Sequence, residues 1–153
     1  MSTLLDHKKV KLVIPPTAIK DNADFVSTVI DLQTDAPTGF KGILFEISVG
    51  ATDIAMATCK VMQSDTKTDA TTLGGTPEEV HDMTTKPAAD ADNTVVGIWV
   101  PRGKITERYV QLQMKAGDGS AGTFASATAQ FDTPGESGAT ATLAGFSTLE
   151  SAA

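Results

Sequence analysis

A glycine-rich stretch, residues 117–122 (GDGSAG), matches the pattern GxGxxG, which cradles a pyrophosphate in dinucleotide-binding proteins. That chemistry requires a helix directly after the motif, because the pyrophosphate lies on the free amides of a helix N-terminus. Here residues 123–131 follow, and their alternation of small and larger side chains is typical of a strand. We therefore predict that the glycines form a hairpin turn with positive φ and bind no cofactor.

The acidic and histidine residues form no metal-binding pattern. Residues 65–69 are spaced faintly like a calcium loop, but Ala70 stands where the turn glycine belongs and Thr76 where the closing glutamate belongs. His7 and His81 are far apart and have neither a cysteine nor a second histidine at ligand spacing. We expect no metal and no cofactor.

Other reactive residue types also lack the neighbours that catalysis needs. The single cysteine, Cys59, falls among small residues of an expected strand, which favours a buried, inert thiol over a nucleophile. Glu46 and Glu107 fall inside expected strands, where solvated faces or salt bridges are favoured over a catalytic carboxylate pair. We therefore expect that the protein is not an enzyme.

Trp99 and Tyr109 are the only residues of their types and both fall within expected strands. Our main interpretation is core packing with a hydrogen-bonded polar tip. The alternative is that they anchor an interface with a partner, since these residue types are favoured there.

The rest of the chain must position these residues, and its dominant pattern is short strands separated by turn residues. Segments rich in β-branched residues, or alternating in side-chain character, end repeatedly at glycine or proline. This pattern predicts an all-β protein, an antiparallel jelly-roll-like β-sandwich. The seven expected strands are Val10–Ile14, Phe25–Leu32, Ile43–Val49, Ile54–Gln63, Val95–Val100, Ile105–Lys115 and Thr123–Phe131.

Helix signals are nearly absent. At Thr76-Pro77-Glu78-Glu79 a threonine, a proline and a glutamate are spaced as in a capping box, so residues 76–83 could form a short helix or an irregular loop. The surrounding stretch, residues 64–93, holds few large apolar residues. We expect it to be one long loop between strands.

The two ends differ from the middle and divide the chain into three parts. We expect an N-terminal arm over residues 1–9, a sandwich domain over 10–131, and a flexible C-terminal arm rich in Gly, Ala and Thr over 132–153. Two interpretations of the arms stay open: mobile termini, or segments that become ordered against a neighbouring chain. The large apolar residues that we expect at an interface with another protein chain are Leu4, Leu5, Leu143, Phe146 and Leu149.

Composition narrows the class of partner. The 153 residues carry a net charge of −7, and such an acidic surface repels a phosphate backbone, so we expect no binding to nucleic acid. No apolar run approaches the roughly 18 residues of a membrane-spanning helix, and the first 16 residues lack the features of a signal peptide. A single cysteine forms no intrachain disulfide, which fits folding in a cytoplasm.

Six short motifs stand out along the chain: Ile30-Asp31-Leu32, residues 42–47 (GILFEI), residues 61–65 (VMQSD), Trp99-Val100-Pro101, residues 108–112 (RYVQL) and residues 122–127 (GTFASA). Together they resemble the Bordetella-phage-type family of tailed-phage capsid cement (decoration) proteins. The resemblance covers roughly residues 25–131. The long loop around 64–93 and the chain after Phe131 depart from the family pattern.

The resemblance implies a jelly-roll sandwich that binds the outer surface of an icosahedral capsid in the virion and stabilises contacts between major capsid proteins. Its implied partners are the major capsid protein and copies of itself, as a dimer or a trimer. Two alternatives remain. One is another virion module, such as a tail, baseplate or head-fibre component. The other is a carbohydrate-binding sandwich module, although the chain is poor in the aromatic residues that form sugar-binding platforms.

Overall fold

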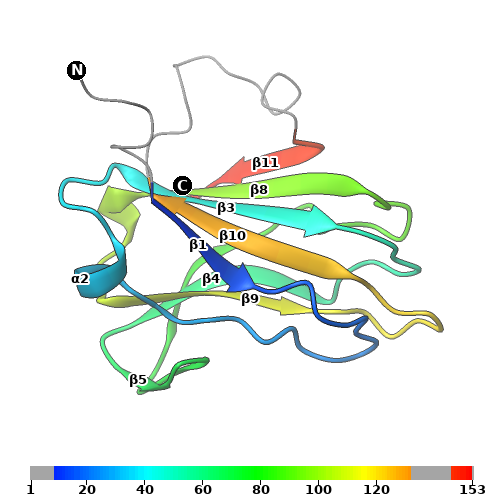
Figure 1. Ribbon diagram of the computed structural model, residues 1–153, viewed down its shortest axis with the longest axis horizontal. Helices are drawn as coiled ribbons and strands as arrows, with labels where there is room; N and C mark the ends of the chain where they lie inside the picture. The colour runs from blue at the N-terminus through cyan, green and yellow to red at the C-terminus, as the bar shows by residue number, and fades with distance from the viewer. Residues whose placement is uncertain (1–8, 132–145, 153) are drawn as a thin grey trace.

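The computed structural model describes residues 9–131 and 146–152, which form two β-sheets packed face to face (Figure 1). The five-stranded sheet has the order β1 (Lys9–Ile14), β10 (Ala125–Phe131), β3 (Gly42–Val49), β8 (Thr94–Pro101) and β11 (Thr148–Ser151). The four-stranded sheet has the order β2 (Ile30–Asp31), β9 (Tyr109–Lys115), β4 (Thr58–Ser64) and β7 (Glu78–Asp82). The remaining elements are a hairpin of β5 (Lys67–Asp69) and β6 (Thr72–Leu73), the short helix α2 (Leu32–Asp35), and a 3₁₀ turn at Arg102–Lys104.

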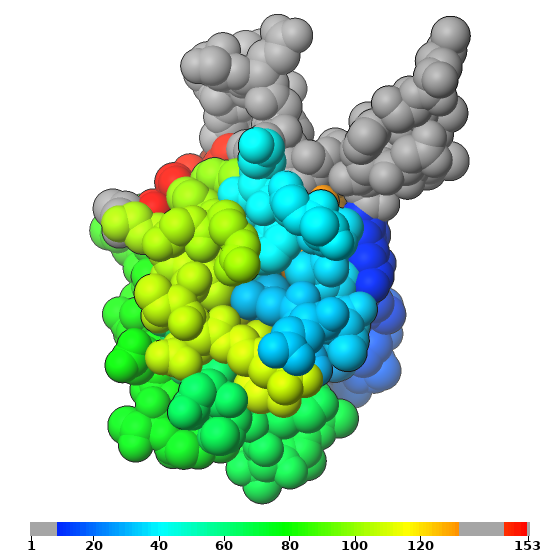
Figure 2. Space-filling model, turned by 90° about the vertical axis from the view of Figure 1, so that its left-hand side faces the viewer, coloured from blue at the N-terminus to red at the C-terminus, as the bar shows by residue number. Residues whose placement is uncertain are grey.

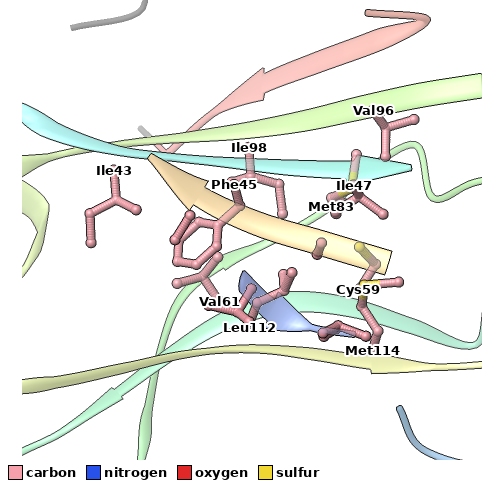
Figure 3. Close-up of a cluster of buried hydrophobic side chains, with 14 of the residues drawn as sticks. Ile43, Phe45, Ile47, Cys59, Val61, Met83, Val96, Ile98, Leu112 and Met114 are labelled. Carbon is pink, nitrogen blue, oxygen red and sulfur yellow. The ribbon is translucent and has the colours of Figure 1, made fainter. Parts of the chain in front are cut away.

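The core lies between the two sheets and follows from alternation along each strand. In β3 the residues Ile43, Phe45 and Ile47 are fully buried, whereas the residues between them reach the outer face. Figure 3 shows these side chains pointing toward Val61 of β4 and Leu112 of β9 in the opposite sheet. The expected all-β sandwich is confirmed.

The expected strand over Phe25–Leu32 is mostly wrong. Only Ile30 and Asp31 pair as β2. The preceding residues form an extended segment whose amides bond to β9, to β1 and to the turn between β5 and β6. The strand then stops because the carboxylate of Asp31 accepts a hydrogen bond from the amide of Gln33 and caps helix α2, which begins at Leu32. The expected strands at 54–63, 105–115 and 123–131 exist but begin later, at Thr58, Tyr109 and Ala125.

Neither a helix nor one irregular loop fills the stretch after β4. The hairpin β5–β6 and strand β7 lie within residues 64–93, and β7 pairs antiparallel with β4, where Val61 lies opposite His81. The local capping signal at Thr76 would satisfy a few amides of an isolated helix, whereas pairing with β4 satisfies a ladder of backbone groups. Tertiary pairing therefore decides this segment.

The end of the chain also differs from expectation. Residues 148–151 form β11, which pairs in parallel with β8 of the same chain, so part of the expected C-terminal arm belongs to the sandwich. The side chains of Phe146 and Leu149 both lie over Gly97 of β8, where an added Cβ would approach them to within 2.9 and 2.8 Å. A glycine at position 97 thus leaves room for the two side chains to cover the sheet.

Trp99 and Tyr109 are not core residues, which corrects our main interpretation. Both are half-buried, and Trp99 lies on the outer face of the five-stranded sheet, since the buried residues of β8 are its neighbours Ile98 and Val100. The ring of Trp99 packs against Gly42 of β3, a position where any side chain would collide with it. A glycine at position 42 therefore leaves the space that the Trp99 ring occupies.

Candidate interaction surface

One side of the sandwich is covered by the N-terminal flank, which we define as residues 9–29. The flank consists of the edge strand β1 and the extended segment that leads from β1 toward β2. It lies on the side that faces the viewer in Figure 1, and its dark-blue residues form the right-hand flank in Figure 2. It spans the open side between β1 of one sheet and β2 of the other.

Backbone hydrogen bonds hold the flank at several points along its length. The amide of Lys20 and that of Thr123 each donate to the other residue's carbonyl, at 2.9 and 2.7 Å. Farther along, the amide of Phe25 donates to the carbonyl of Met114 (2.9 Å), and the Phe25 ring enters the core with 7% of its surface exposed. The flank is therefore a fixed surface rather than a loose connection.

Exposed aliphatic residues concentrate on this flank. Among the described residues, four large hydrophobic side chains are exposed, and all four belong to it: Val10 (59%), Leu12 (52%), Ile19 (57%) and Val26 (61%). Single exposed aliphatic residues are ordinary on a protein surface. We call these four residues, which follow one another along a single segment of the chain, the apolar strip. Exposed apolar residues concentrated in one region are typical of contact with another macromolecule.

Charge along β1 is arranged so that the strip stays apolar. The ammonium group of Lys11 lies 2.6 Å from the carboxylate of Asp35, and that of Lys9 donates to the carbonyl of Thr34 at 3.3 Å. Both lysines thus bond to residues of helix α2. Val10 and Leu12, at the alternate positions, are exposed. The alternation VKLVI separates the two functions of β1: one set of residues anchors it and the other faces outward.

The glycine-rich stretch 117–122 is filled by the chain itself. The carboxylate of Asp53 accepts hydrogen bonds from the amides of Ser120 and Ala121, both at 2.6 Å, and of Gly122 at 3.1 Å. These amides lower the pKa of the Asp53 carboxyl. The predicted hairpin is wrong, because this segment connects β9 of one sheet to β10 of the other. Of its three glycines, Gly122 has the expected positive φ and the other two do not. An internal carboxylate occupies the place that a phosphate would need.

The other chemically suggestive residues also have structural partners. Cys59 is buried, which raises the pKa of its thiol to about 12. The carboxylate of Glu46 accepts a hydrogen bond from Gln130 at 2.7 Å on the outer face of the five-stranded sheet. His81 contacts Glu150 at 2.8 Å, and His7 lies outside the described residues. Within residues 9–131 and 146–152, no His, Cys, Asp and Glu side chains group in threes or more as a metal site would need.

The five expected interface residues fall into two groups. Phe146 and Leu149 are half-buried against β8 of their own chain, as described above. Leu4, Leu5 and Leu143 lie outside the described residues. The apolar strip, which the structure places on β1 and the segment after it, was not among the expected residues. Its signal was present in the alternation of Val10 and Leu12 with lysines, which marks an edge strand with one apolar face.

No protein-family model, curated protein or solved structure matches the chain. The sandwich and its surface therefore carry the functional argument together with the motifs of the sequence. No helix in the described part of the chain is both long and apolar enough to cross a membrane.

Proposed function

We propose that this protein is a virion structural component, a cement protein that binds the outer surface of a phage capsid and stabilises contacts between major capsid proteins. The observation that carries the proposal is the apolar strip on the N-terminal flank, formed by Val10, Leu12, Ile19 and Val26. A rigid strip beside a sheet edge is suited to lie on the surface of a protein shell.

The order of the strands supports the jelly-roll form of the sandwich. Eight strands remain when the hairpin β5–β6 and β11 are left aside. If these eight are renumbered 1 to 8 in chain order, the five-stranded sheet without β11 has the order 1-8-3-6 and the four-stranded sheet has the order 2-7-4-5. Successive strands therefore mostly alternate between the sheets, as two interleaved Greek keys require, and jelly rolls are frequent in viral capsid proteins and lectins. Fold alone does not assign a function, so this strand order is consistent with the proposal but is not sufficient evidence for it.

The motifs that resemble the cement-protein family have structural roles that explain why they belong together. Asp31, in the IDL motif, accepts two hydrogen bonds from Arg108, in the RYVQL motif, at 2.9 and 2.8 Å. Gln63, in the VMQSD motif, is buried and accepts a hydrogen bond from the amide of Thr106, just before Arg108. Three of the six motifs thus meet at one end of the four-stranded sheet, and the other three lie in or next to strands β3, β8 and β10 of the five-stranded sheet. These positions support a shared architecture rather than a shared reaction.

The proposal is tested on shells from which this protein has been stripped. We expect such shells to lose resistance to heat or osmotic shock, and added purified protein to restore it. Unchanged resistance of the stripped shells, or absence of the protein from purified virions, would overturn the proposal. Immunogold imaging of virions supplies an independent test, since label on the tail or baseplate would assign the protein to a different virion module.

A further inference from the structure

The four-stranded sheet carries a pocket on its outer side. The floor is formed by β4 and β9, one wall by residues 24–27 of the N-terminal flank, and the other by the hairpin β5–β6, which Figure 1 shows beneath the sheet. Its volume is about 470 Å³. Volumes of roughly 300–1,000 Å³ are typical of sites that bind small molecules.

A buried glutamine holds the two walls of the pocket in place. The side-chain nitrogen of Gln111 donates to the carbonyl of Ser27 in one wall (2.9 Å) and to that of Thr71 in the other (2.8 Å). Gln113 then donates to the side-chain oxygen of Gln111 at 3.1 Å. Because Gln111 is only 4% exposed and bonds to both walls, the pocket is built into the fold rather than being a gap between mobile loops.

Several polar groups of the lining are left without partners among the described residues. They are the carboxylate of Asp24, the hydroxyl of Thr58, the ammonium group of Lys60 and the side-chain oxygen of Gln113. Ser27 also lines the pocket, and its buried hydroxyl has no hydrogen-bond partner among the described residues. Polar groups on the pocket surface that have no partner inside the protein, such as those of Asp24, Thr58 and Lys60, are available to hydrogen-bond to a ligand seated here.

The chemistry of the lining defines the class of ligand. Lys60 only donates hydrogen bonds, Asp24 only accepts them, and Thr58 can do both, so a ligand must offer donors and acceptors close together. The opposite charges of Lys60 and Asp24 favour no net charge on the ligand. Val26 and Leu73 add apolar surface to the same pocket. Hydroxyl groups arranged around a ring that also presents C–H faces meet all three requirements.

We propose that this pocket binds a neutral saccharide of one or two units. The inference is independent of the capsid proposal, because the pocket lies on the outer side of the four-stranded sheet, whereas the apolar strip begins on β1 of the other sheet. Val26 is the residue common to both surfaces, so a bound sugar lies next to the strip rather than on it.

Calorimetric titration of the full-length protein tests the proposal. The probes are glucose, galactose, mannose, N-acetylglucosamine and disaccharides of these, and a polysaccharide that ends in the same units. We expect at least one soluble sugar to bind, and Thr58→Val and Asp24→Asn each to weaken that binding about tenfold, the equivalent of one hydrogen bond to a polar or charged group. Binding of the polysaccharide as well would identify a surface glycan as the source of the ligand. Binding of the soluble sugar alone would identify a free saccharide.

Matched substitutions away from the pocket serve as controls. Thr128→Val lies on the outer face of the five-stranded sheet, and Asp118→Asn lies in the exposed turn after β9; both should leave sugar binding within about twofold of the unmodified protein. Thermal unfolding of each variant identifies those that retain the fold. No binding by any sugar at about 10 mM would overturn the proposal. Binding that folded Thr58→Val and Asp24→Asn variants leave unchanged would overturn it equally.

Discussion

His81 of β7 and Glu150 of β11 lie 2.8 Å apart, side-chain nitrogen to carboxylate oxygen, and join the edge strands of the two sheets. The same carboxylate accepts hydrogen bonds from the amides of Thr84 (3.0 Å) and Thr85 (2.8 Å). One glutamate thus closes the side of the sandwich opposite the N-terminal flank. It also connects the end of the chain to a segment almost seventy residues earlier.

Glu150 predicts acid sensitivity of strand β11. Burial raises the pKa of its carboxyl, but the hydrogen bonds from Thr85, His81 and Thr84 outweigh burial and hold the pKa below its ordinary value of 4.5. The carboxylate therefore stabilises the folded chain above pH 4.5, and this contribution is lost as the pH falls through the lowered pKa. We expect protection factors of the β11 amides in hydrogen exchange to fall selectively in that range.

Glu150→Gln should reproduce this loosening at neutral pH, with a loss of about 1–2 kcal/mol in the free energy that holds β11 in place. Glu107→Gln is the matched control, because the structure gives the Glu107 carboxylate no hydrogen bond to a described residue. Equal protection of β11 in the Glu150→Gln variant and the unmodified protein would contradict the role of this carboxylate.

Cys59 should resist modification in the folded protein. Burial raises the pKa of its thiol to about 12, so almost no thiolate is present at neutral pH, and the side chain is fully buried. We expect no measurable reaction with a thiol reagent under native conditions and complete reaction after unfolding in denaturant. Rapid labelling of the native protein at pH 7 would show that the strand β4 opens or that the thiol is accessible.

Asp31 should be important for stability because it serves two elements. Its carboxylate caps helix α2 and accepts two hydrogen bonds from Arg108, which lower the pKa of this carboxyl. We expect Asp31→Ala to reduce the free energy of unfolding by about 1–2 kcal/mol in denaturant titrations, against a negligible change for the exposed Asp118→Ala. The substitutions Asp31→Ala and Arg108→Ala should be non-additive when combined; additive effects would mean that the pair contributes nothing as a unit.

The apolar strip provides a test of capsid binding at the level of residues. We expect the double substitution Val10→Asp and Leu12→Asp to weaken binding to stripped shells more than about tenfold, because charged groups would have to be desolvated in the contact. Both side chains are exposed, so the melting temperature should change little. Lys104→Asp, at the exposed turn before β9, is the control. Normal shell binding by the folded double variant would exclude the strip as the contact surface.

Much of the sandwich could be predicted because its strands alternate strictly. In β3 and β10 every second residue is apolar or alanine and is buried, so the sequence determines both the strand and the face that it presents to the core. The buried environment of Cys59 and the positive φ of Gly122 followed from the same local patterns. These features depend on neighbours within a few positions, which a sequence displays directly.

The contacts between segments far apart in the sequence were determined only by the tertiary structure. Strand β7 follows a helix-capping signal, yet pairing with β4 determines its conformation, and β11 joins the sheet because Gly97, more than fifty residues earlier, leaves space for Leu149. The pocket likewise exists only because Gln111 bonds to two loops that are far apart in the chain. Such pairings depend on which surfaces meet after collapse, and local propensities of a few tenths of a kcal/mol do not determine that.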